Sequence, residues 1–153
     1  MKKFIFSVIL FSGTYVTFAQ DNHDNNRDQR PPSNVQNRFR KDYPDAKETQ
    51  WQQNNGQWNA NFKDNRHDGN VKTYYDKNGR RVDTHIPWQQ SAIPVPVTKR
   101  VNTRYHSDYS NTERIERPGQ KPVYKLHVKE HDKDRTIYMD ENGHEKRYND
   151  THR

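Results

Sequence analysis

Two short segments decide the fold, "YYDKNGRRV" at residues 74–82 and "IYMDENGHEK" at residues 137–146. In both, an aromatic residue is followed by Asp-x-Asn-Gly and then by basic or polar residues. Asp at the start of a tight turn and Gly in a left-handed position are typical of a hairpin between two strands. A calcium loop would need oxygen ligands at alternating positions and a final bidentate carboxylate, whereas Arg80 and Arg81 follow the first turn. The segments therefore predict the same turn twice, without a metal.

The residues around these turns alternate between apolar and polar, as half-buried antiparallel strands do. Each strand should hold one set of side chains in a core and present the other on the opposite face of the sheet. The inward set comprises Trp58, Ala60, Phe62, Val71, Thr73 and Tyr75, and the outward set comprises Asn59, Asn61, Lys72 and Tyr74.

A helix is predicted before the first strands, in "SNVQNRFRKDYP" at residues 33–44. Apolar residues recur every four positions there, which places them on one helical face, and Ser33 with Gln36 fits a capping box. Because Pro44 disfavours a helical conformation at the preceding residue, we expect the helix to end at Tyr43. The apolar face consists of Val35, Phe39 and Tyr43.

The same order of elements recurs about 62 to 66 residues later. A second apolar helical face is followed by Ile115 in the place of Trp51, by a second alternating strand and by the second Asp-x-Asn-Gly turn. We therefore predict an α+β fold made of a tandem repeat, two units that each pack one helix on an antiparallel sheet in two layers. The units span residues 32–87 and 93–149, with a connector at residues 88–92. The apolar residues that repeat the pattern of the first unit are Val97, Val101, Tyr105, Tyr124, Leu126 and Val128.

The first residues of the chain predict export. Residues 1–19 combine Lys2 and Lys3 with a short apolar run and a cleavage site after Ala19, which indicates a secretory signal peptide and not a membrane span. The chain contains no cysteine, so neither a lipid anchor on cysteine nor disulfides are expected. We expect residues 20–31 to form a polar, disordered leader and residues 150–153 to form a tail. We expect a periplasmic or secreted protein that does not stay inserted in a membrane.

The composition limits both the core and the partners. Only 27% of the residues are hydrophobic, which approaches the disordered class, but the aromatic content and the clear periodicity favour a folded chain. The formal net charge of +7 is spread along the chain without a basic block. Export and the lack of a recognition motif argue against nucleic acid as a partner. A mild attraction to anionic polymers of the cell envelope is compatible with this charge.

The remaining chemical candidates point away from an enzyme. His127 and His131 have the spacing of a helical zinc pair, but "YKLHVKEH" alternates as a strand, which would separate them by roughly 13 Å. No third metal ligand follows at a suitable spacing, no nucleophile-elbow motif surrounds a serine, and cysteine is absent. We expect no metal, no organic cofactor and no catalytic activity.

Several stretches together resemble a known family. "NVQNRFRKDYPDAKETQW", "WNANF" and "YYDKNGRRV", with their echo in "VPVTKRVNTRY", "YKLHV" and "IYMDENG", are similar to the PepSY-like proteins exported by Bacteroidetes-type bacteria. The resemblance covers roughly residues 32–149. It implies a fold like that of the β-lactamase-inhibitor protein and an exported binding or inhibitory module.

The candidate functional surface is the sheet face that the helices leave uncovered. One interpretation is a solvated sheet face, and the other is a basic, tyrosine-bearing docking surface. The leading hypothesis is a non-enzymatic binding module, with a protein inhibitor as one form of it. The alternative is a structural envelope protein that associates with anionic polymers through its charge. The candidate partner-binding residues are Asn59, Asn61, Tyr74, Lys125, His127, Lys129 and Tyr138.

Overall fold

The computed structural model describes residues 30–106, 108–131 and 133–148. The predicted signal peptide, most of the predicted leader and the predicted tail lie outside these residues. The elements follow one another as α1 (Ser33–Asp42), β1 (Lys47–Asn54), β2 (Gln57–Lys63), β3 (Asn70–Tyr75), β4 (Arg81–Pro87), the short 3-10 helix η1 (Gln90–Ala92), α2 (Val95–Tyr105), β5 (Tyr109–Glu116), β6 (Val123–Glu130) and β7 (Lys133–Asp140).

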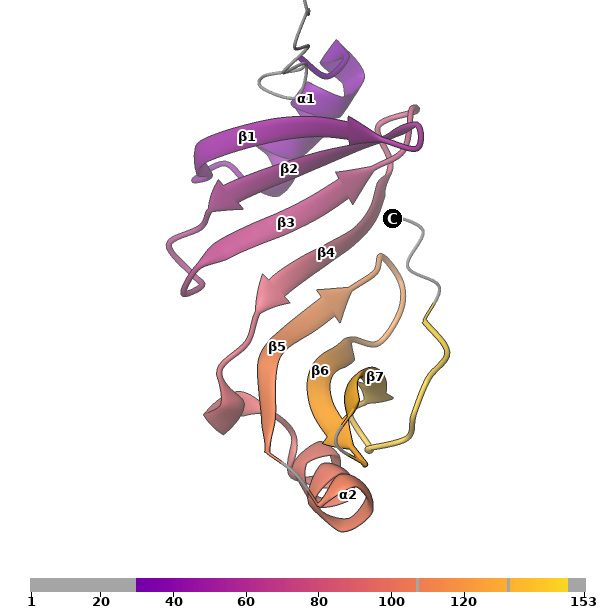
Figure 1. The fold of residues 1–153 in the computed structure, drawn as a ribbon. Coiled ribbons are helices and arrows are strands. Elements are labelled where there is room, and N and C mark those ends of the chain that lie inside the picture. The colour runs from indigo at the N-terminus through magenta and orange to yellow at the C-terminus, as the bar shows by residue number, and fades with distance from the viewer. Residues whose placement is uncertain (1–29, 107, 132, 149–153) are drawn as a thin grey trace, which may run out of the picture.

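All seven strands form one antiparallel sheet in chain order, β1 to β7 (Figure 1). The expectation of two separate sheets is therefore wrong. Four residue pairs, from Thr84 with Glu116 to Pro87 with Glu113, join β4 to β5. This pairing satisfies backbone groups that two separate sheets would leave at exposed edges. After β7, the described residues of the second unit add a single bridge between Met139 and Glu145.

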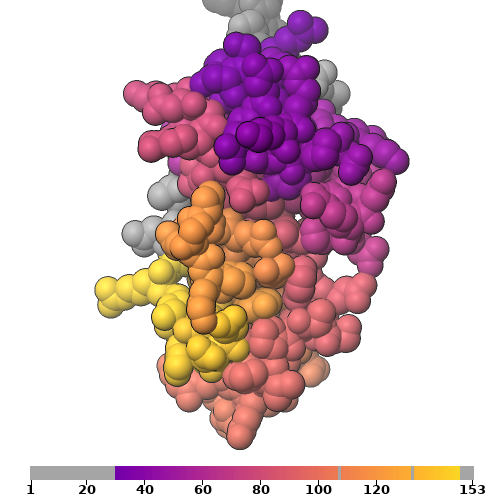
Figure 2. All heavy atoms as spheres, turned by 180° about the vertical axis from the view of Figure 1, so that it is seen from behind, coloured from indigo at the N-terminus to yellow at the C-terminus, as the bar shows by residue number. Residues whose placement is uncertain are grey.

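Each helix packs on its own part of the sheet and closes its own core. The half-buried Trp88, in the connector, packs against both cores, so the two lie side by side. In the view from behind, the indigo segment that includes α1 covers the top of the molecule (Figure 2). The first core comprises Val35, Phe39, Tyr43, Trp58, Ala60, Phe62, Val71, Tyr75 and Ile86, and the second comprises Ile93, Val97, Val101, Tyr105, Tyr124, Leu126, Val128, Ile137 and Met139.

The ends of α1 agree only in part with the sequence. The helix ends at Asp42, followed by Tyr43 in a non-helical conformation, as Pro44 predicts. The predicted capping box is wrong, because Ser33 is already helical and no side chain caps the helix. Gln36 donates from Nε2 to the Pro31 carbonyl oxygen at 2.6 Å instead. Neither α1 nor any other helix in the described part of the chain has the length and apolar character needed to cross a membrane.

The two Asp-x-Asn-Gly segments form the predicted turns. Asp76 Oδ1 accepts the backbone N–H groups of Asn78 and Arg80, both at 2.9 Å. In the second turn, Asp140 Oδ1 accepts two backbone N–H groups in the same way, both at 3.0 Å. The glycine of each turn has φ +78° and lies against the first turn of the helix of its own half. The turn therefore ties the hairpin to the helix as well as joining two strands.

One predicted equivalence between the halves is wrong. Trp51 pairs with Ala60 and packs against Phe39, with 5.1 Å between ring centroids, so it faces α1. Ile115 pairs with His85 and Val123. Directly opposed residues share a face of the sheet, so Ile115 lies on the face turned away from the helices. The register of β5 shifts between Ser110 and Glu113, and sequence spacing does not predict such a shift.

Candidate functional site

The sheet face opposite the helices, called here the open face, carries a polar pocket where β4 meets β5. The cavity has a volume of about 290 Å³. Strands β2 to β4 supply one wall and strands β5 and β6 the other, so the cavity depends on the pairing of β4 with β5. We call it the junction pocket, and its lining residues are Asn61, Asn70, Lys72, Tyr74, His85, Pro87, Glu113 and Lys125.

An ion-pair network crosses the junction pocket from one half to the other. Glu113 Oε2 lies 3.0 Å from His85 Nδ1 and 3.1 Å from Lys125 Nζ. Burial alone would raise the pKa of Glu113, but the hydrogen bond with His85 and the nearby Lys125 ammonium lower it to about 2. The carboxylate therefore stays ionised and holds both cationic groups in place.

His85 lies between two carboxylates. Its Nε2 is 3.7 Å from Asp83 Oδ1, and its Nδ1 faces Glu113. Burial favours the neutral imidazole, but the interactions with Asp83 and Glu113 prevail and raise the pKa of His85 above its usual value. The ring packs edge-on against Tyr74, with 5.4 Å between centroids. The position of the imidazole is therefore fixed by charge on two sides and by an aromatic ring on a third.

The last described residues run back over the open face. We call residues 144–148 the C-terminal strap, and Figure 1 shows it rising from the end of β7 towards β4. The Tyr148 ring stacks on Tyr138 with centroids 4.6 Å apart and planes 16° apart. Its hydroxyl donates to Asp83 Oδ2 at 2.6 Å, and the Arg117 guanidinium lies 4.3 Å from its ring centroid. The strap therefore occupies part of the surface that the sequence assigned to a partner.

The structure brings only some of the predicted site residues to the junction pocket. Asn61 and Lys125 line it. Tyr74 also lines the pocket but is only 9% exposed. Asn59 on β2, which pairs with Tyr74 on β3, is only 4% exposed. These two side chains therefore offer a partner little surface. Tyr138 is half-buried beneath Tyr148.

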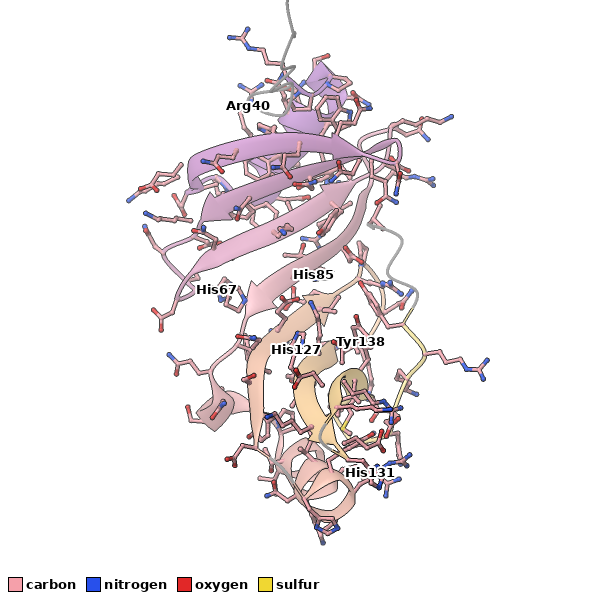
Figure 3. The ribbon with its side chains drawn as sticks, in the orientation of Figure 1. Arg40, His67, His85, His127, His131 and Tyr138 are labelled. Carbon is pink, nitrogen blue, oxygen red and sulfur yellow. The ribbon has the colours of Figure 1, made fainter. Side chains whose placement is uncertain are left out.

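The other predicted site residues lie further along β6. Lys129 is exposed. His127 is half-buried, and its Nδ1 lies 3.3 Å from Thr136 Oγ1. Figure 3 shows His127 on the C-terminal half of the sheet and His131 closer to α2, so the two histidines lie apart. Within the part of the chain that the structure describes, no group of three or more His, Asp and Glu side chains is arranged to hold a metal ion.

Sequence reasoning missed several residues of this face. Lys72 belongs to the outward set of its strand, and Asp83 and His85 are two residues apart on β4, so alternation could have found all three. Glu113 lies beyond the register shift in β5, and Tyr148 lies outside any periodic segment. For these two residues the sequence carries no such signal.

A larger cavity, of about 560 Å³, lies between the β2–β3 loop and the connector. Several of its polar groups are paired with one another. Gln89 Nε2 donates to Asp68 Oδ2 at 2.7 Å, and Trp88 Nε1 donates to the Ala92 carbonyl oxygen at 3.0 Å. We place the candidate site at the junction pocket because charged groups from both halves converge there.

Comparisons with known proteins support the fold. No family model and no curated protein matches the chain. A DUF2874 family protein from Bacteroides ovatus is 22% identical with a TM-score of 0.69, covering 77% of this chain and 86% of that one. A BLIP-like protein from Bacteroides fragilis is 20% identical with a TM-score of 0.67, covering 82% and 94%. A protein described as periplasmic, from Bacteroides eggerthii, is 18% identical with a TM-score of 0.69, covering 78% and 88%.

These structures show that the chain has the α+β fold of BLIP-like Bacteroides proteins, as the resemblance implied. The PepSY-like assignment itself stays a prediction.

Proposed function

We propose that this chain is an exported, non-enzymatic binding module that docks a protein partner on its open face, with protein inhibition as one form of that role. The observation that carries the proposal is the junction pocket, where a network of fixed charges spans two halves of one sheet. Charges fixed before binding favour specific recognition, because a partner must present groups that complement them.

We further propose that the chain arose by duplication of one helix-and-strand unit, with boundaries at residues 32–87 and 93–149. Each half contains a helix followed by antiparallel strands, and each contains the same Asp-x-Asn-Gly turn against its helix. In this view the pocket is a product of the duplication, because it forms where one copy meets the other.

The proposed location follows from the predicted signal peptide. Cleavage after Ala19 would release a mature chain beginning at Gln20, without a lipid anchor, into the periplasm or the medium. The likeness to a Bacteroides protein described as periplasmic agrees with this location.

The experiment is affinity capture from the cell envelope of the native organism with the mature chain as bait. The test variant is the double substitution Lys72→Ala and Lys125→Ala, which removes both ammonium groups that line the junction pocket. Lys72 is exposed, and Glu113 keeps His85 as a partner when Lys125 is lost, so we expect the fold to stay intact. The matched control is Lys41→Ala with Lys99→Ala, which removes the same charge from exposed positions on α1 and α2.

We expect the pocket variant to weaken capture at least tenfold and the helix control to leave it nearly unchanged. Loss of capture with the helix control, and not with the pocket variant, would place the site on the helix layer.

The alternative function is association with anionic envelope polymers, which the excess of basic over acidic residues favours. It predicts that both double variants lose binding equally, because each removes two positive charges. It also predicts a steep fall of binding with salt and no saturation at a defined stoichiometry. Saturable capture that survives in the helix control would rule it out.

A further inference from the structure

Tyr148 occupies a site that surrounds its side chain. The Tyr138 ring stacks on it at 4.6 Å between centroids, and the Arg117 guanidinium lies over the ring at 4.3 Å. The Tyr148 ring is therefore in contact with both an aromatic ring and a cation. At its edge, the hydroxyl meets Asp83 Oδ2 at 2.6 Å and His85 Nε2 at 3.3 Å. We call this set of four residues, Asp83, His85, Arg117 and Tyr138, the phenol site.

The chemistry of the phenol site favours a hydroxyl. Asp83 is fully buried, and its Oδ2 accepts the Tyr148 hydroxyl in a charge-assisted hydrogen bond. Removing a hydrogen-bond donor from a buried carboxylate is costly, so a phenylalanine in the same place would bind poorly. A phosphorylated tyrosine would bring its negative charge to the same carboxylate, and repulsion would exclude it.

The C-terminal strap is held closely only as far as Lys146. The Tyr105 hydroxyl donates to Glu145, Glu145 bridges to Met139, and the side chains of His144 and Lys146 lie close to Asp140. Glu145 lies 3.4 Å from Arg104 and 3.7 Å from Arg135, and the Lys146 N–H donates to the Tyr138 carbonyl oxygen at 2.8 Å. After Lys146, the contacts that the structure describes are those of the Tyr148 side chain. Residues 144–147 are exposed. Tyr148 can therefore leave the phenol site without breaking the pairing between strands, as expected of a segment of low local stability.

We propose that the phenol site receives an unmodified tyrosine side chain from a protein partner, and that Tyr148 is an internal competitor for it. The inference rests on the proposed docking of a protein on the open face, and it names the partner's contact residue. His85 belongs both to the phenol site and to the junction pocket, so one partner segment can reach both. While Tyr148 is bound, only the fraction of molecules with a displaced strap can bind, which lowers the apparent affinity.

The test uses the mature chain and a synthetic peptide, acetyl-Lys-Arg-Tyr-amide, which copies residues 146–148. Matched peptides carry phenylalanine or phosphotyrosine in place of tyrosine. Binding is followed by nuclear magnetic resonance titration of the wild-type chain and of the Tyr148→Ala variant. We expect the variant to bind the tyrosine peptide at least tenfold more tightly than the wild type does. It should also prefer this peptide at least tenfold over the other two.

Equal affinity for the tyrosine and phenylalanine peptides, or no binding to the variant, would overturn the inference. If the Tyr148→Ala variant does not fold, the wild-type chain still tests the inference. Saturating tyrosine peptide should then shift the Tyr148 ring signals towards those of a solvated tyrosine, and unchanged signals would overturn the inference. These outcomes are separate from envelope capture. Capture that depends on Lys72 and Lys125, together with failure of the peptide, would refute the phenol site and leave the proposed docking standing. Peptide binding, together with capture lost only in the helix control, would instead refute docking on the open face.

Discussion

In the N-terminal half, Phe39 of α1 meets the rings of Trp51, Phe62 and Tyr75 at centroid distances of 5.1, 5.0 and 6.5 Å. In the C-terminal half, sequence spacing puts Val101 in the place of Phe39. The core that it joins is largely aliphatic, with Leu126, Val128, Ile137 and Met139. One helix therefore packs over a cluster of rings and the other over branched and flexible aliphatic chains.

Large and small side chains change places between the two halves. Ala60 lies in the first core, and sequence spacing puts Leu126 in its place in the second, with both fully buried. A bulky helix residue thus accompanies a small strand residue in one half, and the reverse holds in the other. Cores tolerate such exchanges when the total volume and the pattern are kept. The comparison teaches that this fold requires a filled space between helix and sheet and not a particular residue type.

The largest effect should come from emptying the aromatic core. We expect Phe39→Ala to lower the free energy of unfolding by about 3–5 kcal/mol, because it removes the ring at the centre of the cluster. Val101→Ala deletes two methyl groups and should cost about 2 kcal/mol. Urea denaturation of the mature chain measures both. Val95→Ala is the control, since Val95 is 75% exposed on α2 and should change little. Equal losses for Phe39→Ala and Val101→Ala would contradict the comparison.

Much of this architecture could be predicted from the sequence, for physical reasons. The four-residue period of Val35, Phe39 and Tyr43 places them on one helical face, and Val35 and Phe39 are buried in α1. Alternation correctly assigned Thr73 and Tyr75 to the core. Local rules suffice for these features, because periodicity and turn chemistry act within a few residues.

The candidate site was less predictable because it depends on contacts between distant segments. Pairing of β4 with β5 is made by backbone groups at two strand edges, and side-chain patterns do not encode it. The low exposure of Asn59 follows partly from its cross-strand pairing with Tyr74. The return of Tyr148 to Asp83, 65 positions away in the sequence, follows no local rule.

The second prediction compares how tightly the two turns press against their helices. A Cβ on Gly143 would lie 2.5 Å from the Pro96 carbonyl oxygen, whereas one on Gly79 would lie 3.1 Å from the Asn34 backbone. The left-handed backbone alone costs an alanine about 1–2 kcal/mol. We expect Gly79→Ala to cost about this much or slightly more, and Gly143→Ala to cost clearly more, measured by urea denaturation.

Gly56 provides the control for this pair. Its φ is +74°, and a Cβ there would meet no atom within 4 Å, so Gly56→Ala isolates the cost of the backbone conformation. A Gly143→Ala loss no greater than that of Gly56→Ala would show that the second turn can move away from α2.

The smallest effect concerns the seam between the halves, where His85 of β4 faces Asp83 on its own strand, Glu113 on β5 and Tyr148 on the strap. The pKa of His85 is raised in the folded state, so its stabilising contribution is complete below about pH 6.5, its ordinary pKa, and is lost as the pH rises through the folded value. The pKa of Glu113 is lowered to about 2, so its contribution is present above about pH 4.5 and is lost as the pH falls towards 2.

The seam should therefore be most stable between about pH 4.5 and about pH 6.5. We expect His85→Gln to reduce the fall in stability between pH 6 and pH 9, measured by urea denaturation. His127→Gln, on β6 of the same open face, should keep this fall. An unchanged fall in the His85→Gln variant would mean that the two halves are held together by β4–β5 backbone pairing and Trp88 packing, with no measurable contribution from this charge network.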